Sequence, residues 1–213
     1  MKIETLDVQG FIPAMHAMRA PKNSWARNDT SLDIADNLTI GPNDLDLSLR
    51  LQKAGPEHCK HLRMIMVWAD MSLPLTMHKQ LDTYRAGVEK VSTSTMHTLM
   101  KRELTLDDFE PTSDGGYGEN MYTTIAYIND KIRAYSAEED PATKRYIWDR
   151  VIQALPESFI QKRTVMLSYA ALRNIVRQRK GHKLGEWKVF INWVHTLPYA
   201  DELIFDKEEP LNA

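Results

Sequence analysis

The stretch "HCKHLRMIMVWADMSLPLTMHKQLDTYRAG" (residues 58–87) indicates the fold class more clearly than any other part of the chain. From Leu62 to Trp68, alternate residues fall on opposite sides of an extended backbone, the period expected for a β-strand. The pattern predicts a strand over residues 58–73.

The second half of the same stretch has helical spacing. Pro74 fits the first turn of a helix, Leu75, either Met77 or His78, and Leu81 follow helical spacing, and Gly87 is a suitable end. A strand followed directly by a helix indicates a mixed α/β (α+β) protein.

The residues that precede this stretch predict shorter elements. Residues 2–18 resemble one or two short strands around Gly10 and Pro13. Residues 43–55 begin with Asn and Asp, which favour a helix N-terminus, and end at a glycine, so we expect a helix there. The leucines of this segment are spaced by two, which also fits a strand.

The C-terminal half is predicted to be helical. Residues 105–120 carry many turn signals and predict a surface excursion. After them, apolar spacing and terminal Pro or Gly residues predict four helices. No boundary between domains is visible, so we expect one domain over residues 1–213. The helices are predicted within residues 120–136, 140–156, 157–181 and 184–198.

The composition is that of a globular protein. The 213 residues are 43% hydrophobic and 26% charged, with a formal net charge of −2. No overall charge favours nucleic acid or an anionic membrane, so we expect neither partner. Cys59 is the single cysteine of the sequence, which rules out an intrachain disulfide. We see no signal-peptide pattern and no apolar run long enough to span a bilayer, and we expect a cytoplasmic protein.

Familiar catalytic and metal-binding motifs are missing from the sequence. His58 and His61 are three residues apart, but no third metal ligand follows at a suitable spacing. Cys59 adjoins His58, and neighbours in sequence do not make a nucleophile–base pair. No phosphate-binding loop, dinucleotide fingerprint or nucleophile elbow is present. A charged ligand must therefore be held by a local cluster.

One such cluster lies near the end of the predicted helix 157–181. The helix dipole favours basic residues at a C-terminus, which explains Arg177, Lys180 and Lys183. Arg179 lies closer to the apolar side of the helix, where an arginine is expected to hold something anionic or planar.

A second cluster follows the predicted helix 74–87. Gln80 and Tyr84 are four residues apart and share a helix face. The hydroxyl-rich residues after Gly87 could cradle a phosphate through Ser92, Thr93 and Ser94. The same three residues could instead simply start the next helix.

Three segments resemble the flavin-dependent thymidylate synthases, the ThyX family. "LQKAGPEHCKHLRMIMVW" (51–68) resembles the family's Leu-x-Lys-x-Gly-His segment and the strand after it. "PLTMHKQLDTYR" (74–85) has the Pro and Gln of its Arg-His-Arg segment, and "SYAALRNIVRQR" (168–179) follows a Leu-Pro pair at the family's distance. The resemblance spans roughly residues 45–195 in the family's order.

The resemblance includes departures from the family's motifs. The Arg-His-Arg triplet is replaced by Thr83-Tyr84-Arg85, and the family's Asn-Ala-Arg element is here Ser168-Tyr169-Ala170. The matching residues that remain are Gln80, Arg85, Leu172 and Arg179. The family pattern therefore implies the ThyX-like fold, a small central sheet with long helices, around an altered site.

The resemblance also implies site residues. Arg179 is expected to hold the pyrimidine of a deoxyuridine nucleotide and to offset charge that builds on its ring. The remaining nucleotide contacts are expected from Gln80, Ser92, Thr93 and Ser94, and flavin contacts from His58, His61, Tyr84, Arg85 and Asn174. Arg63 or Lys90 could replace the charge lost from the triplet.

As a cofactor the resemblance implies FAD, with NADPH and methylene-tetrahydrofolate as possible co-substrates. It also implies a homotetramer whose active sites lie between subunits. The expected activity is C5 methylation, or a related modification, of dUMP or a similar nucleotide. The alternative is a catalytically inactive protein of the same fold that binds a nucleotide or has a structural role.

Overall fold

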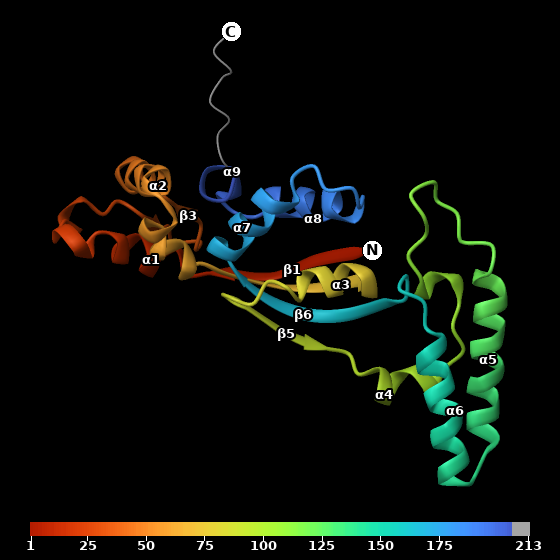
Figure 1. Cartoon of the computed structure of the whole chain (residues 1–213). Helices are drawn as coiled ribbons and strands as arrows, with labels where there is room; N and C mark the ends of the chain where they lie inside the picture. Colours follow the sequence, from red (N-terminus) through yellow and green to blue (C-terminus); the bar gives the residue numbers. More distant parts are fainter. Residues whose placement is uncertain (206–213) are drawn as a thin grey trace. The chain divides into compact units, whose positions relative to one another are not determined.

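The computed structural model describes residues 1–205 (Figure 1). Contacts within the chain divide it into two compact units. Unit 1 consists of Met1–Ile3, Asp70–Thr83 and Val91–Thr164, and unit 2 consists of Glu4–Ala69, Tyr84–Lys90 and the residues from Val165 onwards.

A four-stranded sheet has the order β1-β4-β6-β5. In β4, Val67, Ala69, Met71 and Leu73 are completely buried and their neighbours less so, because successive side chains of a strand point to opposite faces. The predicted mixed α/β class with a small sheet and several helices is confirmed. The strands are β1 (Lys2–Gln9), β4 (Met66–Pro74), β5 (Val88–Ser92) and β6 (Ile160–Ser168).

Unit 1 contains a helical hairpin, α5 (Met121–Ala137) and α6 (Pro141–Ala154), whose helices lie side by side (Figure 1). The Asp140 carboxylate accepts a hydrogen bond of 2.8 Å from the Thr143 N–H, which caps the N-terminus of α6. Pro141 occupies the first turn, where proline is favoured, so both residues stabilise the start of α6. The two helices predicted within residues 120–136 and 140–156 are thus confirmed. Shorter helices of this unit are α3 (Leu75–Leu81) and α4 (Thr95–Thr98).

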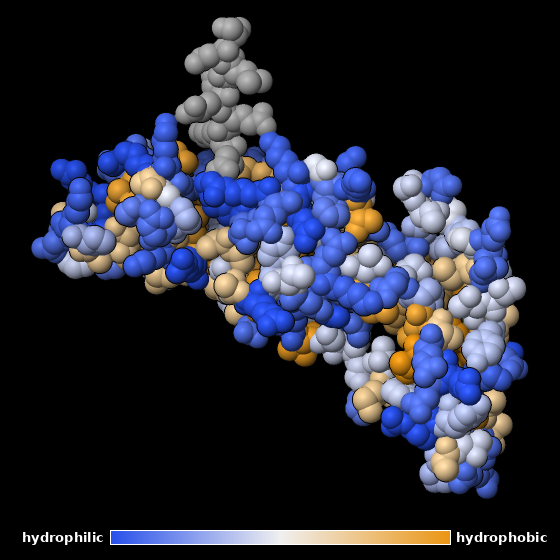
Figure 2. Space-filling view, viewed as in Figure 1, coloured by the Kyte–Doolittle hydropathy of each residue, from blue (hydrophilic) through white to orange (hydrophobic). Residues whose placement is uncertain are grey.

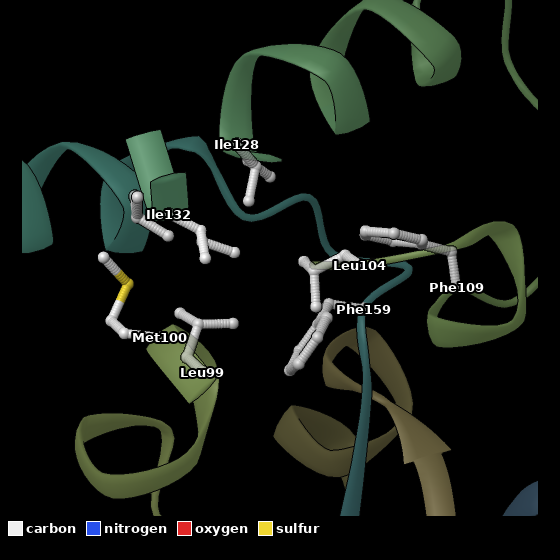
Figure 3. Close-up of a cluster of buried hydrophobic side chains, with 8 residues drawn as sticks. Leu99, Met100, Leu104, Phe109, Ile128, Ile132 and Phe159 are labelled. Atoms are coloured by element: carbon white, nitrogen blue, oxygen red, sulfur yellow. The ribbon is translucent and has the colours of Figure 1, made fainter. Parts of the chain in front are cut away.

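The core of unit 1 is a cluster of buried hydrophobic side chains (Figure 3). Ile128 and Ile132 project from one face of α5, four residues apart. The rings of Phe109 and Phe159 meet edge to face with centroids 5.9 Å apart. Phe109 therefore anchors the excursion at residues 105–120. The cluster comprises Leu99, Met100, Leu104, Phe109, Ile128, Ile132, Val151 and Phe159.

Unit 2 contains most of the remaining helices. The predicted helices 43–55 and 184–198 are confirmed as α2 and α8. Trp187 and Phe190 of α8 are buried, with ring centroids 5.4 Å apart. A small hairpin pairs Ser31 with Thr39 in antiparallel register. The elements are α1 (Phe11–Met18), β2 (Ser31–Leu32), β3 (Leu38–Thr39), α2 (Pro42–Ala54), α7 (Tyr169–Arg179), α8 (Glu186–His195) and α9 (Ala200–Leu203).

A buried carboxylate ties the loop after α1 to α2. Asp44 is completely buried and accepts hydrogen bonds from Arg19 Nε at 2.8 Å and from the N–H groups of Asp29 and Thr30. The Thr30 hydroxyl donates a fourth bond, at 2.7 Å. Because its oxygens are satisfied in this way, the charge of Asp44 is tolerated inside the protein.

Four sequence predictions are wrong in part. The strand expected over residues 58–73 begins only at Met66, because Pro56–His58 and Lys60–Arg63 form 3-10 helices. Ile160–Ser168 is strand β6, although residues 157–181 were expected to be helical throughout. Residues 11–18 form helix α1 rather than a second strand. The helix expected over residues 74–87 ends at Leu81.

Figure 2 shows a mostly hydrophilic surface on the face drawn, with hydrophobic residues in separate patches. Within residues 1–205, no helix combines the length and the apolar character needed to cross a membrane.

Candidate functional site

Unit 2 contains a cavity of about 590 Å³ beside the first turns of α7. Its wall brings together the end of α2 with the turns after it, the loop at Gly87, and α7. Three arginines, small side chains and two amides line it. The lining residues are Gln52, Pro56, Cys59, Leu62, Arg63, Ala86, Gly87, Ser168, Ala170, Ala171, Arg173, Asn174 and Arg177.

The loop at Gly87 packs tightly against the start of α7. Gly87 has φ of +70°, and a Cβ atom there would lie 2.5 Å from Ser168 Oγ. The Gly87 carbonyl accepts a 2.8 Å bond from the Ser168 N–H, and Ser168 Oγ accepts one from the Ala171 N–H, which caps the helix. Glycine is required here by both the backbone conformation and the close contact.

Arg173 is buried in the cavity wall and bonded to other parts of unit 2. Its Nη1 donates a hydrogen bond to Gln52 Oε1. The same Nη1 also donates to the carbonyl oxygens of Leu203 and Ile204, each at 3.4 Å. Gln52 Nε2 donates to Ser48 Oγ and to the Glu202 carbonyl, at 3.3 Å each. The guanidinium is therefore held at the wall by fixed groups.

The same network ends at His61, which the sequence predicted as a flavin contact. His61 Nε2 lies 2.7 Å from Ser48 Oγ, and the ring is buried. Burial lowers the pKa of His61 to about 4, because desolvation disfavours the imidazolium. The ring is thus neutral at pH 7. Within the described chain its Nδ1 atom is buried without a hydrogen-bond partner.

The other polar lining residues are more accessible. Arg63, Asn174 and Arg177 are exposed, and Arg177 lies one helical turn after Arg173. Asn174 Oδ1 accepts a 3.0 Å bond from Gln178 Nε2. Burial raises the pKa of the Cys59 thiol, so this cysteine is poorly suited to act as a thiolate nucleophile. Three cations beside small residues make a wall suited to an anionic ligand.

Arg179, the residue expected to hold the pyrimidine, is not among the residues that line the cavity. Its guanidinium carbon is 4.7 Å from the ring centroid of Trp187 and 5.5 Å from that of Tyr84. Its Nε donates a 2.9 Å hydrogen bond to the Tyr84 hydroxyl, which donates to Gln178 Oε1 at 3.0 Å. Two rings and a hydroxyl therefore set the orientation of this half-buried guanidinium.

Two further predicted residues of unit 2 lie at the surface. His58 is about half exposed, with Nε2 3.4 Å from Glu57 Oε1. Arg85 is exposed directly before the cavity residues Ala86 and Gly87. Asn174 itself lines the cavity, and so does Arg63, which the sequence suggested as a replacement for the charge lost from the triplet.

The remaining predicted residues belong to unit 1. The Gln80 carbonyl accepts bonds from the Thr83 N–H and hydroxyl. Ser92 ends β5, and the Thr93 N–H and hydroxyl both donate to the Lys162 carbonyl. Ser94 stands before α4, where its carbonyl accepts bonds from the helix, as the helix-start interpretation expected.

Sequence reasoning missed several lining residues. Arg177 was considered only as part of a basic helix end, Arg173 was not singled out as a ligand contact, and Gln52 and Gly87 were taken as a helix residue and a helix end. Arg173, four residues before Arg177, gave a spacing signal that pointed to a shared face. Among residues 1–205, no group of three or more His, Cys, Asp or Glu could hold a metal ion.

The fold is similar to that of known enzymes, although the sequence matches no family model and no curated protein. Two solved structures of thymidylate synthase X (ThyX) from Helicobacter pylori, both with FAD and dUMP, superpose with TM-scores of 0.72 and 0.73. In each case the identity is 16%, over 97% of this chain and 98% of the other. At this identity the likeness establishes a ThyX-like fold.

Proposed function

We propose that this protein is a flavin-dependent thymidylate synthase-like enzyme acting on dUMP or a related deoxyuridine nucleotide. The observation that carries the proposal is a basic cavity in a chain whose fold matches, over 97% of its length, structures that contain FAD and dUMP. Both of those molecules carry phosphate groups, and arginine donors suit phosphate.

The residues of the cavity fit a flavin nucleotide. Arg63, Arg173 and Arg177 supply donors and positive charge, and Gly87 lines the same cavity. Asn174 adds an amide at the same wall. We assign these residues to a phosphate-bearing ligand, with FAD as the cofactor. When bound and reduced, the flavin supplies hydride, and NADPH and methylene-tetrahydrofolate are the proposed co-substrates.

Arg179 is the proposed pyrimidine contact. The Tyr84 hydroxyl accepts from Nε, and the guanidinium lies over the Trp187 ring. Guanidinium donors held in a fixed plane match the carbonyl oxygens of a uracil edge and favour negative charge on the ring. Gln80, Ser92, Thr93 and Ser94 remain proposed contacts of the same nucleotide.

Tyr84 stands in the middle of the triplet that replaces the family's Arg-His-Arg, and its contacts give it a different role from a ligand contact. Its ring is buried against Trp187 and Arg179 of its own chain. We propose that Tyr84 orients Arg179 and that His58 and Arg85, which are exposed, contact the flavin. We also propose one domain, a cytoplasmic location and a homotetramer with shared sites.

A second candidate is a protein of the same fold that binds the nucleotide without turnover. The contacts of Tyr84 favour this candidate. Tyr84 occupies a position of the family's ligand-binding triplet, but its hydroxyl is bonded to Gln178 and Arg179 of its own chain. In this case dUMP would stabilise the protein against heat, and no thymidylate would form.

A turnover assay separates the two candidates. Protein loaded with FAD is given dUMP, methylene-tetrahydrofolate and NADPH, and dTMP is measured by chromatography. The enzyme proposal expects dTMP, lost in Arg179→Ala and retained in Gln153→Met, an exposed change on α6. Stabilisation by dUMP without product would favour the binding protein, and neither effect would overturn both.

A further inference from the structure

Arg173 differs from the other arginines of the cavity. It is 7% exposed, whereas Arg63 and Arg177 are exposed. A surface arginine loses side-chain freedom when it binds a ligand, which opposes binding. Arg173 is already fixed by its bonds to Gln52 and to the carbonyl groups of α9 and the residue after it. It therefore meets a ligand at a lower entropic cost.

The hydrogen bonds around Arg173 have a defined direction. Arginine only donates, so the atom of Gln52 that faces it must be the carbonyl oxygen Oε1. The amide nitrogen of Gln52 must then point the other way, where Ser48 Oγ and the Glu202 carbonyl accept from it. A flip of this amide would lose the bonds to Arg173, which only donates, and to the Glu202 carbonyl, which only accepts, so the orientation of Gln52 is determined.

Ser48 is held in turn by His61. Ser48 Oγ and His61 Nε2 are 2.7 Å apart, and both residues are at most 3% exposed. Ser48 and Gln52 are one turn apart on α2, and the ring of His61 is packed beside them. The four residues form a buried chain from the cavity wall into unit 2.

We propose that Gln52 is a positioning residue that holds the Arg173 guanidinium at the cavity wall for a phosphate group of the ligand, with Ser48 and His61 keeping Gln52 in place. The phosphate-bearing ligand class rests on the proposed function. The geometry of the buried chain does not depend on it. Pre-organised donors of this kind are what a phosphate site needs for affinity.

The test is a double-mutant cycle on the full-length protein with Gln52→Met, Arg173→Met and the double variant. Dissociation constants for FAD, dUMP and inorganic pyrophosphate are measured well below the melting temperature. For the ligand that places its phosphate at Arg173, Gln52→Met should weaken binding by about tenfold. Arg173→Met should weaken binding of that ligand at least as much, and the double variant should bind it as weakly as Arg173→Met. Gln153→Met serves as the control and should change nothing.

Each outcome of this experiment either supports or overturns the positioning role of Gln52. Equal affinity in Gln52→Met and wild type overturns the positioning role while binding itself still supports the proposed function. A full tenfold loss from Gln52→Met in the Arg173→Met background also overturns it, because Gln52 would then act without Arg173. If wild type binds none of the three ligands, both proposals fail.

A second variant covers a folding defect in Gln52→Met. Ser48→Ala removes one acceptor of Gln52 Nε2 and leaves the bond to Arg173, so we expect about threefold weaker binding of the same ligand. An unchanged affinity in a folded Ser48→Ala protein would contradict the supporting role of Ser48. If the Gln52→Met protein does not fold, the same unchanged affinity of Ser48→Ala would overturn the proposal.

Discussion

Nε of Arg179 donates a hydrogen bond to the Tyr84 hydroxyl at 2.9 Å, so a tyrosine of the loop after α3 fixes an arginine at the end of α7. Tyr84→Phe removes this acceptor and the donor to Gln178 and keeps the ring. We expect the free energy of unfolding to fall by about 1–2 kcal/mol, measured by urea denaturation. The exposed Tyr122→Phe is the matched control, and an equal effect of the two changes would contradict the structural role of the hydroxyl.

Gly87→Ala tests the close contact of the loop with α7. Its new Cβ would lie 2.5 Å from Ser168 Oγ at φ of +70°, so we expect a loss of about 2–3 kcal/mol in unfolding free energy. Gly115 has φ of +81° with no atom within 4 Å of its Cβ position, so Gly115→Ala should cost about 1 kcal/mol. Equal losses in chemical denaturation would show that the contact with Ser168 does not matter.

The buried His61 should make stability depend on pH. Its pKa is lowered from 6.5 to about 4 in the folded protein, so between these values the unfolded chain binds more protons. Stability is then complete above pH 6.5 and falls by about 3 kcal/mol as the pH drops to 4. Urea unfolding from pH 4.5 to 7.5 should show a shallower dependence in His61→Gln, and parallel curves would speak against burial of a neutral ring.

The core of unit 1 predicts a large cost for Ile128→Ala. Ile128 is completely buried in the cluster of α5, so the change should cost about 2–5 kcal/mol through lost burial and a new cavity. Ile34, at the tip of the β2–β3 hairpin, is fully exposed, so Ile34→Ala should stay within about 0.5 kcal/mol. Similar melting temperatures of the two variants would contradict this core.

Much of the fold was predictable because strong local signals agree with the packing. The helices α5, α6 and α8 follow apolar spacing, which flanking Pro residues support for α6 and α8, and α2 follows its acidic start and Gly55. The strand β6 was missed because Leu167, Ala171 and Ile175 have helical spacing across the point where the strand becomes α7. The alternating burial of Val165 and Leu167 decides the strand, and it depends on sheet neighbours far away in sequence.

The start of α1 was missed for a related reason. Gly10 has φ of +98°, and a Cβ there would lie 2.1 Å from the Met64 carbonyl oxygen. This close approach, made by residues distant in sequence, places the turn before Phe11. Sequence spacing alone favoured a strand around Gly10 and Pro13.

The candidate site was predictable only in part. Asn174 and the neighbourhood of Arg85 were found through the family pattern, and Arg179 was singled out by its place near the apolar side of α7. The buried chain of Gln52 and Arg173 joins α2 to α7 across 121 residues. No spacing within either helix reports such a contact, so it could be found only from the fold.

Retention of FAD by the purified protein is the decisive measurement for the proposed flavin site. The purified protein is incubated with FAD, desalted and scanned for flavin absorbance, alongside Arg173→Met and the control Gln153→Met. We expect wild type and the control to retain FAD and Arg173→Met to retain much less. A wild-type protein that stays colourless, and that FAD does not stabilise against heat, would contradict the proposed flavin site.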